Sequence, residues 1–320
     1  GRLGYNTLPS EIIYKHVGTW SGWYGGKTRF HTYRVYNGQN TVTCVRKSLR
    51  MAKHMAEDKA DLLLNEKVSI VVQDGQDELD KILLDNDFFT QGNQLVEYAQ
   101  ALGTAAFVEY LETDAMGHSK VCIDYINDPR RIWPLSWTKD SVQECAFVSV
   151  AQDRQKGKIY YVSLHLLDKG VYVVQNKVFD ENGKELPLPD GLQAEWTAGS
   201  SIPTFQIYRP NIANNLDPDS PLGISVFANS IDILKVLDVI YDSYFNEFVL
   251  GRKRIFVDAT VLHVDITPGG TGETRPVFDP NDAVFYNLPN MESDRTKPIV
   301  ESNMELRAQE HQQALQDNLD

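Results

Sequence analysis

The stretch NSIDILKVLDVIYDSYFNEFVLGRKR, Asn229 to Arg254, predicts one helix of about 22 residues, or about 33 Å at 1.5 Å per residue. Neither glycine nor proline interrupts it before Gly251, where a helix end is expected, and the cations that follow suit the negative end of the helix dipole. On a helical wheel its apolar residues share one broad arc: Ile233, Leu234, Leu237, Ile240, Tyr241, Tyr244, Phe245 and Phe248. The opposite arc comprises Asp232, Lys235, Asp238, Asp242, Asn246 and Glu247. The stretch therefore predicts a long helix packed against several neighbours, with an acidic face open to solvent.

The chain has 320 residues and a formal net charge of −13. Such an excess of acids argues against a protein that grips nucleic acid or an anionic membrane through bulk electrostatics, but it permits one that surrounds DNA without adhering to it. The three cysteines, Cys44, Cys122 and Cys145, form no C-x-x-C pair, which indicates buried thiols in a reducing compartment. We therefore expect no disulfide, no metal and no cofactor. No apolar run is long enough for a membrane span. Because the chain starts at Gly1 and stops at Asp320 within an expected helix, we expect it to be a fragment.

The part of the chain before the long helix predicts helices first and antiparallel strands afterwards. Helices are expected at 8–17, 49–66, 78–84 and 94–102, with a strand at 67–72. Period-two alternation then predicts strands at 105–111, 119–126, 132–137, 145–151, 158–167 and 171–179, before a long loop at 181–203. Residues 211–223 predict a polar hinge with two prolines, after which Ser225 is expected to cap the long helix.

The part after the long helix predicts a small β unit and a second helix. Residues 254–266 and 283–288 alternate as strands, and 299–320 predict a helix in which Ser302 and Glu305 form a capping box. The β unit of about 45 residues is too small to bury a core alone, so it needs neighbours. All segments together predict an α+β fold.

Two motifs suggest ligand chemistry, and both are weak. GGKT, Gly25 to Thr28, matches the end of a phosphate-binding loop, but Ser21 stands where the first glycine is required and no apolar strand precedes it. His54 has no second histidine at a ligand spacing, so we expect neither a metal site nor a catalytic residue. The aromatic residues from Trp20 to Tyr36 are more typical of packing than of a stacking surface. A soluble phosphate-binding enzyme and an aromatic-rich ligand-binding module remain the alternatives to a structural protein.

Several segments, taken in chain order, resemble one protein family. They are WYGGKTRFHTYRVYNG (Trp23 to Gly38), SLRMAKHMAEDKADLLLNEKVSI (Ser48 to Ile70), DSPLGISVFANSIDILKVLDVIYDSYFNEFVLGRKRIFV (Asp219 to Val257), and FDPNDAVFYNLP with MELRAQEHQQAL between Phe278 and Leu315. They are similar to portal proteins of tailed bacteriophages, in the subgroup from long-tailed phages of Gram-positive hosts. The succession of a helix, a small β unit and a returning helix matches the stem and clip of that family.

The resemblance implies a portal-like fold, with an α+β wing, long stem helices and a small β-containing clip. The wing would be residues 1–228, the first stem helix 229–252, the clip 253–300, and the start of the second stem helix 301–320. The family's tunnel loop, remaining wing and crown have no counterpart in this sequence. We therefore expect no direct gripping of DNA by a tunnel loop.

The resemblance also implies a ring, usually of twelve subunits, at one vertex of the capsid in the virion, assembled in the host cytoplasm. Double-stranded DNA would pass through it non-specifically during packaging and ejection. The implied partners are further copies of the chain, the terminase large subunit, a head–tail adaptor, the scaffold protein and the major capsid protein. No enzyme activity is implied, because ATP hydrolysis would belong to the terminase.

Within such a ring, the polar arc of the long helix is interpreted as channel-facing, and Leu237, Ile240, Tyr241, Tyr244, Phe245 and Phe248 as stem packing. Four acids and Lys235 give that arc a charge of −3 per subunit, which repels phosphates over about 8–10 Å at physiological salt. A merely solvated helix face is the alternative interpretation.

Two further groups of residues are candidates near the clip. Arg252, Lys253 and Arg254 either cap the helix dipole or form a basic ring. The candidates for the interface with the adjacent subunit or with the terminase are Phe278, Asp279, Asp282, Val284, Phe285 and Tyr286. Because the edges of a small sheet are otherwise unpaired, we expect the clip strands to pair between subunits.

Overall fold

The computed structural model describes residues 11–36, 40–65, 67–113, 119–138, 141–153, 157–189, 192–250, 254–258, 285–288, 299–302 and 306–319. Its internal contacts divide the chain into two units. The first unit comprises residues 1–29 and 50–234, and the second comprises residues 30–49 and 235–320. Helices and strands both contribute to the structure, which confirms the predicted α+β class.

Two antiparallel sheets form the centre of the first unit. The three-stranded sheet has the order β11-β3-β4, formed by β3 (Ala105–Thr113), β4 (Ser119–Ile126) and β11 (Phe205–Tyr208). The six-stranded sheet has the order β10-β8-β7-β6-β5, with β9 beside β8. Its strands are β5 (Ile132–Thr138), β6 (Ser141–Asp153), β7 (Gly157–Asp168), β8 (Val171–Asp180), β9 (Glu185–Leu186) and β10 (Glu195–Thr197). The strands predicted between 105 and 179 are confirmed, and the predicted loop at 181–203 contains β9 and β10.

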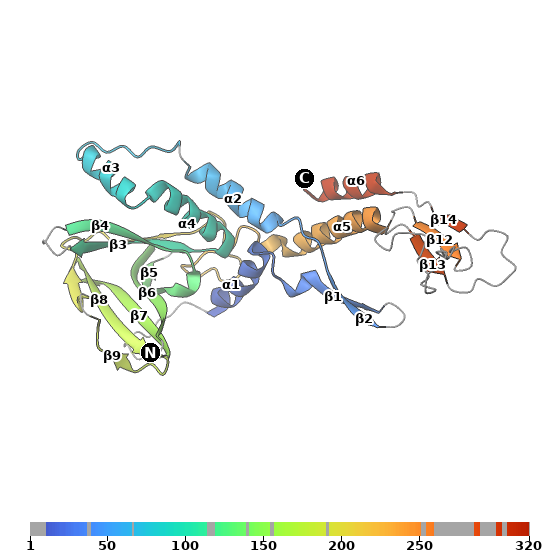
Figure 1. The fold of residues 1–320 in the computed structure, drawn as a ribbon. Coiled ribbons are helices and arrows are strands. Elements are labelled where there is room, and N and C mark those ends of the chain that lie inside the picture. The colour runs from blue at the N-terminus through green and yellow to red at the C-terminus, as the bar shows by residue number, and fades with distance from the viewer. Residues whose placement is uncertain are drawn as a thin grey trace, which may run out of the picture. The chain divides into compact units, whose positions relative to one another are not determined.

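The two sheets of the first unit share a core, which includes Val108, Phe147 and Phe205. Because side chains alternate along a strand, Phe107 points to the other face of the three-stranded sheet, where it packs with Leu95 of α4 (Phe88–Leu102). The first unit therefore has three layers: helices, the three-stranded sheet and the six-stranded sheet (Figure 1).

The helices of the first unit differ from their predictions mainly at their ends. α1 (Glu11–Tyr24) runs past the predicted 17, because Ile13, Val17, Trp20 and Trp23 continue one buried stripe at helical spacing. Two of the aromatic residues from Trp20 to Tyr36 are thus core residues. α2 (Met51–Leu63), α3 (Gln76–Asp85) and the earlier start of α4 complete this layer.

The strand predicted at 67–72 is not formed with any described part of the chain. The segment is extended, and the side chain of Gln76 replaces a partner strand on one edge. Its Oε1 accepts from the N–H of Val72 at 2.9 Å, and its Nε2 donates to the carbonyl of Ile70 at 3.1 Å.

The outer edge of β4 is closed by a single side chain. Asn86, directly after α3, accepts from the N–H of Ile123 at 2.8 Å and donates to the carbonyl of Val121 at 3.0 Å. The backbone carbonyl of Asn86 accepts from the Tyr125 hydroxyl at 3.0 Å. This amide group therefore occupies the hydrogen-bonding positions that another strand would use.

The segment predicted as a polar hinge ends in a buried anchor. Ile224 and Phe227 are fully buried, and the N–H of Gly223 donates to Thr104 Oγ1 at 2.9 Å. Ser225 accepts from the N–H of Phe227 at 3.3 Å, so it caps a short turn rather than the long helix. A 3-10 helix (Ala228–Ser230) then leads into α5 (Ile231–Leu250).

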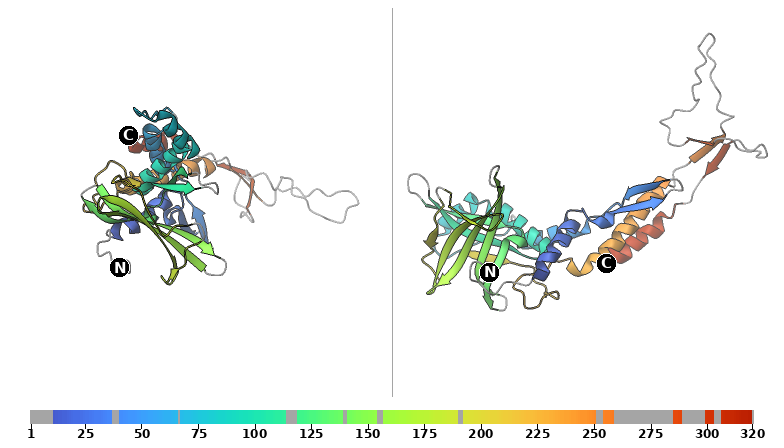
Figure 2. Two further views of the ribbon diagram at one scale, coloured as in Figure 1. Left: turned by 90° about the vertical axis from the view of Figure 1, so that its left-hand side faces the viewer. Right: turned by 90° about the horizontal axis from the view of Figure 1, so that it is seen from below.

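The second unit contains an antiparallel ribbon of β1 (Thr32–Tyr36) and β2 (Thr41–Val45), α5 from Lys235 onward, and α6 (Ala308–Leu319). The ribbon and α6 lie on opposite sides of α5 in Figure 1 and in the right-hand view of Figure 2. α5 ends at Leu250, which is close to the predicted helix end.

Three short strands also belong to the second unit. β12 (Arg254–Asp258) lies between β13 (Phe285–Leu288), which is parallel to it, and β14 (Ile299–Ser302), which is antiparallel. The helix predicted from 299 is wrong at its start, because the β-branched Ile299 and Val300 pair with β12 instead. Ser302 belongs to β14, so it does not form the predicted capping box.

Candidate functional site: helix α5 and its contacts

Two acids of α5 that the sequence predicted to be open to solvent are buried. Asp238 is 3% exposed and Asp242 is 8% exposed. The Asp238 Oδ2 lies 2.7 Å from the Nε2 of His31, and its Oδ1 accepts from the N–H of Leu49 at 2.9 Å. The expectation of an open acidic face is therefore wrong for Asp238 and Asp242.

Asp242 holds the same segment one helical turn further on. Its Oδ1 accepts from the N–H of Lys47 at 2.8 Å, and its Oδ2 lies 3.3 Å from the donor Nδ2 of Asn246. Burial and then the Asp242 carboxylate raise the pKa of Tyr33 in β1. Backbone N–H groups beside a helix need acceptors, so the two carboxylates attach the β1–β2 ribbon to α5 through hydrogen bonds.

The remaining polar candidates lie at the two ends of α5. Asp232 is exposed and Lys235 is half-buried. Glu247 accepts from the N–H of Arg307 at 3.2 Å, and its carboxylate lies 3.6 Å from the Arg307 Nε. The backbone hydrogen bond from Arg307 is the main cause that lowers the pKa of Glu247. Glu247 thus connects α5 to the segment that enters α6.

The predicted packing residues of α5 are covered to different degrees. Leu237 is buried, whereas Ile240, Tyr241 and Tyr244 are half-buried. Phe245 is 40% exposed and Phe248 is 43% exposed.

A second group of apolar side chains, on another flank of α5, is also exposed. It contains Val236 and Val239, with exposed fractions of 46% and 41%. The ribbon and α6 therefore leave apolar surface uncovered on two flanks of the helix.

The candidates near the clip are described only in part. Arg254 begins β12, and Phe285 and Tyr286 belong to β13, where they pair with Ile255 and Phe256. The other clip candidates lie outside the described residues: Arg252, Lys253, Phe278, Asp279, Asp282 and Val284.

Reasoning from the sequence missed the ribbon, although a signal for it was present. Asn37-Gly38 stands between TYRVY and TVTCV, and Asn-Gly between alternating runs is a strong hairpin signal. His31 and the N–H groups of Lys47 and Leu49, the partners of the buried acids, flank that hairpin.

The GGKT motif follows the C-terminal end of α1 and does not directly precede the N-terminus of an α-helix. The N–H of Gly25 donates to the carbonyl of Ser21 at 2.9 Å, and that of Lys27 donates to the carbonyl of Gly22 at 2.8 Å. Because a phosphate is bound by the free N–H groups of a helix N-terminus, the C-terminal end of α1 is the wrong end for such a site.

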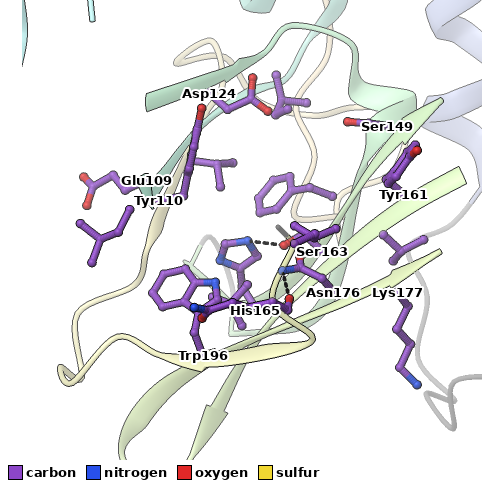
Figure 3. A pocket seen from close by; sticks show the side chains of 18 of the residues that line it. Glu109, Tyr110, Asp124, Ser149, Tyr161, Ser163, His165, Asn176, Lys177 and Trp196 are labelled. Atoms are coloured by element: carbon purple, nitrogen blue, oxygen red, sulfur yellow. Dashed lines mark hydrogen bonds between the residues drawn. The ribbon is translucent and has the colours of Figure 1, made fainter. Parts of the chain in front are cut away.

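A pocket of about 670 Å³ opens between the two sheets of the first unit (Figure 3). The buried His165 lies in it, with Nδ1 2.6 Å from Thr204 Oγ1 and Nε2 3.2 Å from Ser163 Oγ. Burial lowers the pKa of His165 to about 4, so the imidazole is neutral at pH 7. Both imidazole nitrogens therefore lie beside hydroxyl groups, and among the described residues His165 contacts no carboxylate of the kind that orients a catalytic histidine.

Two absences apply to the described residues alone. They contain no cluster of histidine, cysteine or acidic residues that could hold a metal ion. Among their helices, none has the length and hydropathy required to cross a bilayer.

Comparison with known proteins identifies one family. The model of the family described as "Phage portal protein, SPP1 Gp6-like" matches residues 11–285, which is most of the chain. Among curated proteins, no match to the chain is found.

Proposed function

The chain belongs to the phage portal protein family of the SPP1 Gp6-like type, and from this membership we propose that it forms a ring at one capsid vertex. Double-stranded DNA passes through the ring during packaging and ejection. The subunit number usual for the family is twelve. The single observation that carries this proposal is the family match over residues 11–285.

The exposed flanks of α5 support a ring. The ribbon and α6 lie on two opposite sides of the helix (Figure 2, right), and Val239 and Phe248 are both exposed. Nine positions separate these two residues, so at about 100° per residue they lie on opposite faces of the helix. A contact between two different surfaces of identical subunits closes into a ring when the rotation allows it. We propose that the flank of α5 with Phe245 and Phe248 in one subunit packs against the flank with Val236 and Val239 in the next subunit.

The channel-facing role is retained for the polar residues of α5 that do not hold the ribbon. These are Asp232, Lys235 and Glu247, whereas Asp238, Asp242 and its donor Asn246 are assigned to the ribbon contact. Asp232, Lys235 and Glu247 together carry a net charge of −1 per subunit. A wall without an excess of cations releases few counterions from DNA, so the contact with passing DNA is weak and non-specific.

The clip is proposed to complete its sheet between subunits. In the described part of the second unit, β13 and β14 are the outer strands of the order β13-β12-β14. Pairing of such edges with an adjacent copy covers unpaired N–H and carbonyl groups. We assign Arg254, Phe285 and Tyr286 to this region, where the terminase large subunit and then the head–tail adaptor dock. Scaffold and major capsid protein contact the ring from the capsid side.

Native mass spectrometry and negative-stain microscopy of the full chain test the ring. We expect assemblies of about a dozen subunits with a central hole. Val239→Asp or Phe248→Asp places a charge in the subunit contact and shifts the assembly toward monomer. Val150→Asp, at an exposed valine of β6, is the control and leaves the rings intact. A wild-type chain that stays monomeric at every concentration contradicts the proposal, and so does a ring that both α5 variants leave unchanged.

A further inference from the structure

The segment from Val68 to Val72 has the sequence of a strand but no partner strand in the described chain. Four of its five residues are valine or isoleucine, and this composition is typical of strands that are paired in a sheet. Ile70, Val71 and Val72 are nevertheless exposed, and Val71 is 79% exposed. Apolar side chains concentrated on an extended segment are typical of a docking surface.

The two backbone edges of this segment differ. On one edge, the Gln76 amide satisfies the carbonyl of Ile70 and the N–H of Val72. Successive residues of an extended chain direct these groups to opposite sides, so the N–H and carbonyl of Val71 belong to the other edge. Within the described residues, no hydrogen bond joins that edge to the chain. Gln76 thus fixes the segment in a strand-like conformation and leaves one edge available.

The surroundings of the segment determine the charge of its partner. Residues 57–87 contain ten acidic and three basic side chains, a net charge of −7. In sequence, Glu66 precedes the segment with Lys67 between them, and Asp74, Asp77 and Glu78 follow it, the last two in the first turn of α3. Complementary charge guides association and selects the partner.

We propose that residues 68–72 form a docking edge for an extended segment of a partner protein, which adds to the Val71 edge as a strand. The partner segment alternates apolar and polar residues and has lysine or arginine at both ends. Main-chain hydrogen bonds to Val71 supply the register, the valine and isoleucine side chains supply apolar contact, and the acids bind the basic ends. This role is independent of the ring contact on α5.

Titration of the full chain with two labelled synthetic peptides tests the proposal by fluorescence anisotropy. The first, KKVTVTVKK, fits the proposed edge, and the second, EEVTVTVEE, has the same strand with reversed charge. We expect the basic peptide to bind at least tenfold more tightly, with an affinity that falls as salt is raised. Failure of the basic peptide to bind, or equal binding of both peptides, overturns the proposal.

Two variants at one position separate edge pairing from general attraction. Val71→Pro removes the N–H of the available edge, and because that group bonds nothing in the described chain, the fold is retained. Val71→Thr keeps the N–H and the β-branch. We expect at least a tenfold loss of affinity for the proline variant and less than a threefold change for the threonine variant.

Circular dichroism confirms that both variants are folded. Equal affinity of the two variants overturns edge pairing. If the Val71→Pro variant instead forms assemblies with a different number of subunits from those of the wild-type chain, the segment that occupies the edge belongs to a second copy and the proposal is wrong. Neither result bears on whether the wild-type chain forms rings.

Discussion

His31 Nε2 and Asp238 Oδ2 lie 2.7 Å apart, with both side chains almost fully buried. The two residues are 207 positions apart in the chain, and they fix the start of the β1–β2 ribbon against the middle of α5. Because Asp238 also accepts from the N–H of Leu49, one carboxylate holds both ends of the segment that forms the ribbon. The acid that suggested a channel wall is thus a structural anchor.

Removing this anchor destabilises the protein. Asp238→Ala removes the acceptor of the Leu49 N–H and the carboxylate beside the buried His31 ring, so we expect a loss of about 2–4 kcal/mol in the free energy of unfolding. Asp168→Ala, at an exposed acid at the end of β7, is the control and changes it by no more than about 0.5 kcal/mol. Urea denaturation measures both values. Hydrogen exchange of the Leu49 amide reports whether the ribbon has detached from α5. If the two variants lower the free energy of unfolding equally, Asp238 is not the anchor of the ribbon.

Lys53 forms ion pairs with two carboxylates, one mostly buried and one on the surface. Lys53 and Tyr24 both donate to the Glu97 carboxylate, whose side chain is 12% exposed, whereas Lys53 lies 3.7 Å from the more exposed Glu57. Glu97→Gln should therefore cost about 1–3 kcal/mol, and Glu57→Gln no more than about 0.5 kcal/mol. Thermal and urea denaturation compare the two variants. The opposite ranking contradicts the prediction.

Replacement by alanine should have opposite effects at Gly103 and Gly18, because the space for an added Cβ atom differs at the two positions. At Gly103 the φ angle is +93° and an added Cβ would lie 2.6 Å from the carbonyl oxygen of Gly223, whereas at Gly18 in α1 nothing lies within 4 Å. We expect Gly103→Ala to destabilise by about 2–4 kcal/mol, through strain and overlap. Gly18→Ala should stabilise by about 0.5–1 kcal/mol, because alanine favours the helix. Melting temperatures of the two variants should move in opposite directions.

The free energy of unfolding should decrease as the pH is lowered, because His165 is buried. Burial lowers the pKa of His165 to about 4 in the folded chain, below the ordinary value of 6.5, so the unfolded chain binds the proton more readily between these values. The stabilising contribution is complete above pH 6.5 and is lost as the pH falls toward 4, by about 3 kcal/mol in all.

Urea midpoints at pH 7.5 and 5.0 measure this effect. The difference between the two midpoints should shrink in His165→Gln and persist in His54→Gln, which removes an exposed histidine. A pH dependence that is unchanged in His165→Gln would refute the assignment.

Local pattern was sufficient for the sheets but not for the burial of α5. The alternation in strands such as β4 and β8 predicted their positions because their side chains alternate between two faces of one sheet. A helical wheel of α5, in contrast, compares a residue only with its own helix. The acceptors of the Lys47 and Leu49 N–H groups lie 195 and 189 positions away in sequence, so no local period reports them.

The errors at 67–72 and 299–302 have a related cause. Both segments have strand composition, but whether a strand forms depends on a partner elsewhere in the chain. Ile299 and Val300 find β12, so a strand replaces the start of the predicted helix. Val71 finds no partner strand in the described residues, and the Gln76 side chain satisfies only the other edge of its segment.

The Asn86 amide on β4 has a consequence for how the protein behaves at high concentration. An unprotected sheet edge can pair with the edge of another copy, and repeated pairing of this kind leads to aggregation. The Asn86 amide occupies the carbonyl of Val121 and the N–H of Ile123, so these two groups of the β4 edge are not available to another strand. One side chain outside the sheet therefore interrupts the continuous edge that edge-to-edge aggregation requires.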